Sequence, residues 1–453
     1  MTAREDAKQM GKNDEPTFDD KLERLDLVRR VGDKLATCDP PYAVGIHGDW
    51  GCGKTSFLCM LHLYLTGMCP QLGEKDDDCK TVKRIFGEEW RIRDNVTVVW
   101  FEAWRYQHED APIVALLQEM RTQLTWYTKW LRQGKKLAEV AIRGALLSLE
   151  DLTKRIGFQA SKIERAGKDW ERENLAMKLP SHAIREQLEA VFGKLLEGGL
   201  SVDGHTPRVI VLIDDLDRCQ PEVAYKFLEG IKIYLNLKNC VFVLGMDENV
   251  VRDAIAKEVL GLDKPDSKSY LAREYLEKIC QNIWHLPVVA DQAGFLEGFL
   301  EDGPATEAVL RVIREYSCLP ANPRKIKAFA NVVQRYFEHL GWGQKTIIGE
   351  RDAQRGVIMA YLYQFHHDIY RFLEGSPKFY GTIHNWASGE TIDHEAFKDL
   401  KPVLKERSDE PAFADPVVGN VLRIQKLIRD VGLLTEDEVR SSLLDQPASS
   451  RLA

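Results

Sequence analysis

The sequence of 453 residues contains no run of about 20 hydrophobic residues, the length that a membrane-spanning helix needs. The nearest candidate, residues 140–149, is short and is interrupted by Arg143 and Gly144. Residues 1–16 are polar and charged and lack the apolar core of a signal peptide, so we expect a disordered leader there. These absences predict a cytoplasmic protein that does not itself span a membrane.

Paired cysteines are also absent, because the nine cysteines are scattered and no two of them form a CxxC motif. This pattern argues against a zinc ribbon and against a disulfide framework, and it favours reduced thiols that pack as small hydrophobic side chains. Basic residues are slightly outnumbered, and the formal net charge is −8. An acidic total argues weakly against a dedicated nucleic-acid-binding protein, although a local basic patch would still permit nucleic acid as a partner.

Short apolar segments alternate with helical patterns in the first 290 residues, whereas only helical patterns follow. The predicted strands are residues 42–47, 96–101, 208–213, 240–246 and 282–288. Residues 67–93 are charged and irregular, and we predict no element there. This order of elements predicts an α/β domain with a parallel sheet, followed by a helical domain.

A chain of this length is expected to form about two or three domains. We divide it into a leader (1–16), an α/β core (17–290), a helical lid (291–345) and a C-terminal helical region (346–453). A highly charged stretch of the core, residues 132–190, has helical periodicity but no strong apolar face. We interpret this stretch as a helical insertion.

The most specific motif lies between the first predicted strand and a predicted helix. It reads Gly48-Asp49-Trp50-Gly51-Cys52-Gly53-Lys54-Thr55 and matches GxxxxGK[ST], the pattern of a phosphate-binding P-loop. Its glycines let backbone N–H groups turn toward a β-phosphate, and the following helix N-terminus adds partial positive charge. Lys54 is expected to bridge the β- and γ-phosphates, and the Thr55 hydroxyl is expected to bind Mg²⁺.

A second motif ends the third predicted strand, where apolar residues 209–213 are followed by Asp214 and Asp215. In this Walker B arrangement, Asp214 is expected to hold Mg²⁺ through water, and Asp215 is expected to orient or deprotonate the attacking water. Asp is one methylene shorter than the Glu that many ATPases use, which would make hydrolysis slow or dependent on a partner. For Arg218, an ion pair with Asp217 or Glu222 and a role linked to nucleotide are both open.

Three segments resemble the KAP family of P-loop ATPases. They are residues 45–56, which include Trp50 and Ser56, the segment 214–219, and the aromatic segment 100–106. The resemblance implies a P-loop core of the additional-strand type with sheet order 5-1-4-3-2, and ATP rather than GTP as the nucleotide. Members of the family often carry membrane helices between the two motifs, where this chain has the charged residues 132–190.

The resemblance also implies roles outside the two motifs. Glu102 would lie near the catalytic pocket, where the family more often has Asn, and it either activates water or pairs with Arg105; we favour the pair slightly. Asp247 would sense the γ-phosphate, and Ser56 would join the nucleotide-binding loop. Arg324 would couple nucleotide state to the helical domain, unless it simply faces solvent in a helix begun by Pro323.

Together these features imply a Mg²⁺-dependent ATPase that drives a conformational switch or oligomeric assembly. Bacterial members of the family resemble components of defence systems against phages and plasmids, which implies a homo-oligomer that acts with a separate effector protein. Two alternatives are open: a nucleotide-binding scaffold with slow turnover, and a motor stimulated by nucleic acid.

Overall fold

The computed structural model describes most of residues 16–123 and of residues 208–444. Its ranges are 16–68, 78–93, 95–108, 208–234, 239–260, 269–343, 346–389 and 416–444, with short pieces between 115 and 123. The predicted insertion at 132–190, and the leader except its last residue, lie outside the described residues. The chain divides into two compact units between Pro287 and Val288.

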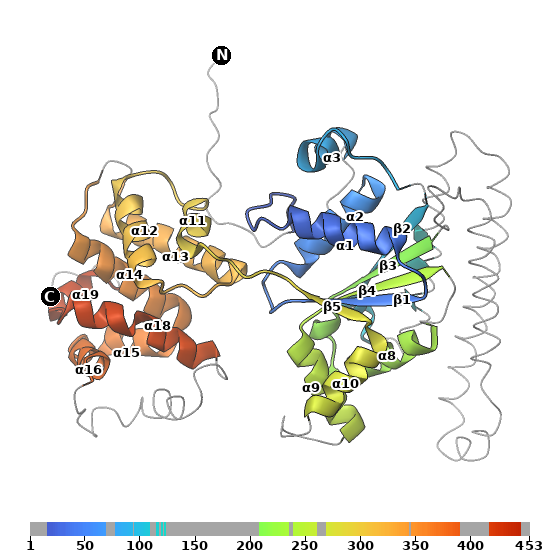
Figure 1. Ribbon diagram of the computed structural model, residues 1–453. Coiled ribbons are helices and arrows are strands. Elements are labelled where there is room, and N and C mark those ends of the chain that lie inside the picture. Colours follow the sequence, from blue (N-terminus) through green and yellow to red (C-terminus); the bar gives the residue numbers. More distant parts are fainter. Residues whose placement is uncertain are drawn as a thin grey trace. The chain divides into compact units, whose positions relative to one another are not determined.

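The first unit is built on a five-stranded parallel sheet (Figure 1). Its strands are β1 (Tyr42–His47), β2 (Val96–Glu102), β3 (Arg208–Asp214), β4 (Cys240–Met246) and β5 (Asn282–His285). Their order across the sheet is β2-β3-β4-β1-β5, and every neighbouring pair is parallel. This is the predicted order 5-1-4-3-2 counted from the opposite edge, so the predicted α/β P-loop fold is confirmed.

Helices cover both faces of the sheet, as Figure 1 shows. One face carries α1 (Leu25–Thr37), α2 (Lys54–Thr66) and α3 (Asp78–Phe86), and the other carries α8 (Pro221–Tyr234), α9 (Glu248–Leu260) and α10 (Ser269–Ile279). Successive strand residues point to opposite faces, so Ile210 packs in the first layer and Val209 in the second. Burial on both faces explains why β3 and β4 are almost continuously apolar in sequence.

Two elements differ from the sequence prediction. Residues 67–93 were expected to be irregular, but α3 forms there and buries Val82 and Phe86 against α2. Val82 and Phe86 are four residues apart, which is helical spacing, but the segment is short and four of its nine residues are charged, so no element was predicted there. β5 ends at His285 rather than at residue 288, because Pro287 has no N–H to extend the ladder after the Leu286 N–H bonds the His47 carbonyl.

The second unit is helical. Its helices are α11 (Gln292–Glu297), α12 (Pro304–Tyr316), α13 (Pro323–Leu340), α14 (Glu350–Phe365), α15 (His367–Gly375), α16 (Phe379–Ala387), α18 (Pro416–Val431) and α19 (Glu436–Ser441). Helix α14 is central and packs on α12, α13, α15 and α18. The described residues of the predicted lid and of the predicted C-terminal region belong to one compact unit. Within the described ranges, we find no helix with the length and apolarity to cross a bilayer.

Close packing of α1 on α2 makes Gly32 a sensitive position. A Cβ at Gly32 would lie 2.4 Å from a ring carbon of Tyr64. We expect Gly32→Ala to lower the free energy of unfolding by about 1–2 kcal/mol, because overpacking strain exceeds the gain in helix propensity. Chemical denaturation followed by circular dichroism measures this change. In a Tyr64→Ala background the same substitution should be neutral or stabilising, and an equal loss there would contradict the packing argument.

Candidate functional site

The P-loop joins β1 to α2 at the carboxyl edge of the sheet. Gly53 precedes α2 with φ 94°, a left-handed conformation that strongly favours glycine. Cys52 is buried, and burial raises the pKa of its thiol, which argues against a reactive cysteine. Asp49 and Trp50 are exposed at the tip of the loop, where the Trp50 side chain is 67% exposed.

Lys54 is buried at the start of α2, and protein groups surround its ammonium. The Nζ donates to the Gly48 carbonyl at 2.7 Å and lies 3.0 Å from the Asp217 carboxylate. Thr55 and Ser56 follow in the first turn of α2 and are half-buried. The Ser56 hydroxyl accepts a hydrogen bond from the Thr17 backbone N–H at 3.2 Å.

Asp214 ends β3 beside the P-loop and is 1% exposed. Burial, reinforced by the charge of Asp215, raises the pKa of Asp214 to about 7, while the nearby Thr55 hydroxyl acts in the opposite direction. Neither carboxylate oxygen receives a hydrogen bond with good geometry from the residues that the structure describes. A buried carboxylate without such a partner is costly, so this position is suited to a cation.

Asp215 follows in the left-handed conformation, with φ 59°. It precedes a short 3-10 helix, η4 (Leu216–Arg218), and its carboxylate pairs with Arg218 at 2.8 Å. Arg218 therefore pairs with Asp215 rather than with the two carboxylates considered from sequence, and Glu222 pairs with Lys226 instead. Burial raises the pKa of Asp215, although Arg218 opposes this rise. An unusual backbone conformation at a non-glycine residue is frequent at functional sites.

Glu102 ends β2 and lies opposite Asp214 in the β2–β3 register. Its carboxylate forms an ion pair with Arg105 of the 3-10 helix η2 (Ala103–Tyr106). The structure thus shows the pair that we favoured over direct water activation. Glu102 nevertheless stands close enough to Asp215 to contribute to the raised pKa of Asp215.

Asp247 follows β4, and its side chain stabilises the beginning of α9. Its Oδ1 accepts the backbone N–H of Asn249 at 3.0 Å, which is a local helix-capping bond. The backbone N–H of Asp247 donates to Asp217 Oδ2 at 3.2 Å. Asp217 therefore contacts both the P-loop lysine and the turn after β4. From sequence, Asp217 was considered only as a partner of Arg218, and its position in the 214–219 segment was the only available signal.

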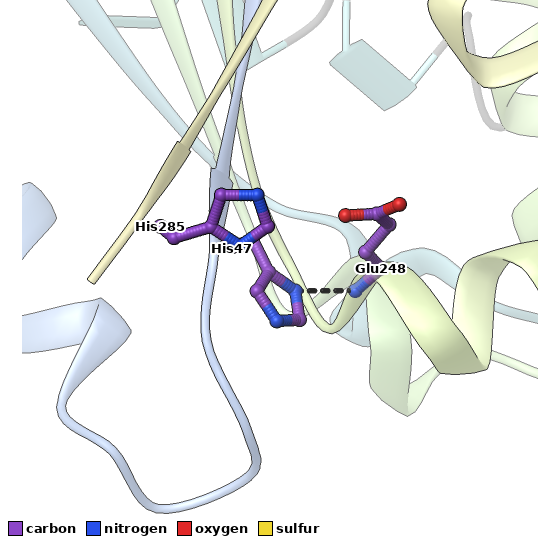
Figure 2. Close-up of side chains that lie close together, drawn as sticks. All are labelled: His47, Glu248 and His285. Atoms are coloured by element: carbon purple, nitrogen blue, oxygen red, sulfur yellow. Dashed lines mark hydrogen bonds between the residues drawn. The ribbon is translucent and has the colours of Figure 1, made fainter. Parts of the chain in front are cut away.

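His47 was missed from sequence, although it immediately precedes the P-loop. It lies close to Glu248 and His285, and their potential ligand atoms are within 4.8 Å of one another (Figure 2). However, Nδ1 of His47 accepts the Glu248 backbone N–H at 2.8 Å, so a metal ion at this nitrogen would compete with that bond. Burial lowers the pKa of His47, which favours the neutral ring. His47 therefore links the end of β1 to the beginning of α9.

Arg324 belongs to the second unit. It lies half-buried in the first turn of α13, which Pro323 begins and Asn322 caps through a bond from the Lys325 N–H. The structure brings together Lys54, Thr55, Asp214 and Asp215 within the first unit. The role of Arg324 as a nucleotide sensor stays a prediction.

Comparison with known families agrees with this geometry. The sequence pattern of the KAP family P-loop domain matches residues 28–294. The chain belongs to the KAP family. The matched range contains both motifs and the whole sheet of the KAP domain, and it ends before α12 of the helical unit. No curated protein matches the chain.

The KAP domain has suitable groups for a nucleotide with Mg²⁺. Lys54 offers an ammonium, Thr55 a hydroxyl and Asp214 a buried carboxylate without a well-formed hydrogen bond from the described protein. Gly245 of β4 packs closely beside that carboxylate, since a Cβ there would lie 2.7 Å from Leu58 Cδ1 and 3.1 Å from Asp214 Oδ1. Hydroxyl and carboxylate oxygens are the ligand types that Mg²⁺ prefers, either directly or through water.

The raised pKa of Asp214 predicts a pH dependence of nucleotide binding. Below about pH 7 this carboxyl group holds a proton in the nucleotide-free protein, and Mg²⁺ requires its removal. Affinity for Mg²⁺-ATP should therefore fall about three- to tenfold from pH 8 to pH 6. Titration calorimetry at several pH values measures this affinity. The Asp214→Asn variant should bind more weakly, and its affinity should not change with pH over this range. A wild-type affinity that is flat across this range would contradict the assignment.

Proposed function

We propose that the KAP domain hydrolyses ATP with Mg²⁺ and that hydrolysis drives a conformational switch or an oligomeric assembly. The observation that carries this proposal is the convergence of the P-loop and the two aspartates that end β3. Lys54 and Asp214 both lie at the carboxyl edge of a parallel sheet, where ligands of open α/β folds bind. The choice of ATP over GTP rests on the KAP family resemblance.

The protein groups supply charge stabilisation and a base. Lys54 binds phosphate oxygens and stabilises their negative charge in the transition state. Bound Mg²⁺ would neutralise further charge on the β- and γ-phosphates. Asp215 accepts the proton of the attacking water, and its raised pKa makes it a stronger base than an ordinary aspartate. The ion pair with Arg218 holds the Asp215 carboxylate in a defined orientation.

The switch itself is proposed to involve the helical unit. The chain leaves the sheet at β5 and enters this unit after Pro287, and the proposed sensor Arg324 lies in the first turn of α13. We further propose a cytoplasmic homo-oligomer that acts in defence against phages or plasmids with a separate effector protein. That part of the proposal is supported by the family resemblance.

Asp215→Asn tests the proposed chemistry. It keeps the shape of the side chain but removes the base, so ATP turnover should fall about 10²- to 10⁴-fold while nucleotide affinity changes little. Lys54→Ala should instead abolish binding. Phosphate release and calorimetry separate the two effects. Glu222→Gln is a matched control, since this exposed carboxylate pairs only with Lys226 among the described residues. Turnover by Asp215→Asn at the wild-type rate would remove Asp215 from the mechanism.

Native mass spectrometry tests the assembly. We expect a larger oligomer with Mg²⁺ and a non-hydrolysable ATP analogue than without nucleotide, because the proposed switch links nucleotide occupancy to subunit contacts. The Lys54→Ala variant should show the same oligomeric state with and without the ATP analogue, namely that of the nucleotide-free wild-type protein. A monomer in both conditions for the wild-type protein would reject assembly and leave only a switch within one chain. Stimulation of turnover by DNA or RNA would instead favour a motor.

A further inference from the structure

The P-loop lysine is already neutralised within the protein. The Lys54 ammonium lies 3.0 Å from Asp217 Oδ2, and both side chains are only 7% exposed. The same ammonium donates to the Gly48 carbonyl, with the Asp49 carbonyl at a longer 3.4 Å. Phosphate oxygens that approach Lys54 must therefore displace a carboxylate, because a P-loop lysine binds the β- and γ-phosphates through this same ammonium.

Neighbouring carboxylates do not provide this neutralisation. Asp215 pairs with Arg218, and the oxygens of Asp214 receive no well-formed hydrogen bond from the described residues. Three aspartates within four residues thus have three different environments. Of these three aspartates, Asp217 is the one that lies within ion-pair distance of Lys54.

A buried ammonium needs such a counter-ion, since an unpaired buried charge is strongly destabilising. The need ends when phosphates arrive, because they bring more negative charge than one carboxylate. The phosphates and the Asp217 carboxylate then compete for one ammonium, and the phosphates carry the larger negative charge. We propose that Asp217 is a placeholder for phosphate: it holds Lys54 when no nucleotide is bound and releases it when nucleotide enters. The inference rests on the proposed function and adds a positioning residue to that site.

Release of Lys54 by Asp217 also affects the beginning of helix α9. Asp217 Oδ2, the oxygen that contacts Lys54, accepts the Asp247 backbone N–H as well. Asp247 in turn caps the first turn of α9. When Lys54 leaves Asp217, the charge that competes for this oxygen is lost and its bond to the turn before α9 strengthens. Nucleotide occupancy of the P-loop is in this way communicated to the start of α9.

Asp217→Asn tests the placeholder. The amide keeps the shape but no longer competes for Lys54, so Mg²⁺ with a non-hydrolysable ATP analogue should bind about five- to tenfold more tightly. The unfolding temperature without nucleotide should fall, because Lys54 stays buried without its counter-ion. The unfolding temperature of the nucleotide-bound protein should fall much less, since phosphates replace the missing negative charge. A residue with only a structural role would lower both temperatures equally.

Glu222→Gln is again the matched control, because it changes the net charge equally at an exposed carboxylate on the following helix. It should leave affinity and both unfolding temperatures unchanged. Affinity of Asp217→Asn that is equal to or weaker than wild type, with the fold intact, would overturn the placeholder. Failure of the wild-type protein to bind nucleotide would instead reject the proposed function. The proposed replacement of Asp217 by phosphate at Lys54 would be rejected with it.

A second measurement covers the case in which Asp217→Asn alone does not fold. Lys54→Met removes the ammonium and keeps much of the side-chain volume, so Asp217 has no charge to neutralise in this background. Adding Asp217→Asn to Lys54→Met should then cost far less stability than in the wild type, or none. This comparison needs no nucleotide. Additive losses at the two positions would show that they are uncoupled and would overturn the proposal.

Discussion

A positive charge buried at the end of an apolar sheet is the constraint around which this site is organised. Lys54 begins a helix that is almost wholly buried, and its side chain is only 7% exposed. It must therefore be neutralised either by the protein or by a ligand. The carboxyl edge of the sheet provides for this, because β1 carries the P-loop and β3 carries the aspartates. The strand between them, β4, ends in the turn that contacts Asp217.

The aspartates after β3 illustrate how burial creates chemical differences between identical side chains. Asp214 is the most deeply buried and has its pKa raised to about 7. Asp215 is less buried and is held by Arg218, while Asp217 faces the lysine. The left-handed conformation at Asp215 turns the chain into a 3-10 helix, and this turn separates the three carboxylates. In the proposed mechanism each serves a different partner: Asp214 a cation, Asp215 a water molecule and Asp217 the Lys54 ammonium.

The cost of burying these charges is offset by the two apolar layers around the sheet. Alternate strand residues pack on α1 and α2 on one face and on α8, α9 and α10 on the other. Burial of this kind is the main source of stability in a folded domain, and it allows a few costly polar positions at one edge. The proposed exchange of Asp217 for phosphate at Lys54 would make the site more stable with bound nucleotide than without it, which is the property that the proposed switch requires.

Much of this fold and the main motifs could be predicted from the sequence. Strands β1 and β4 were predicted with their observed ends, and β2 and β3 to within one residue, because fully buried strands are unbroken apolar runs. The P-loop was predictable because its backbone conformation requires glycines at set positions. Helix α3 was missed, because its apolar residues keep helical spacing over only nine residues, and so short a helix depends on tertiary contacts for its stability.

The sequence by itself thus determined the P-loop, the acidic end of β3 and the alternation of strands and helices, because each depends on adjacent residues. Only the tertiary structure decided which side chains meet. The ion pair of Lys54 with Asp217 and the bond from the Glu248 N–H to His47 depend on how separate elements approach one another. Arg218 pairs with Asp215 locally, across the turn that the left-handed conformation of Asp215 creates. Charge pairing acts through space over a few ångströms, and local sequence patterns do not encode those distances.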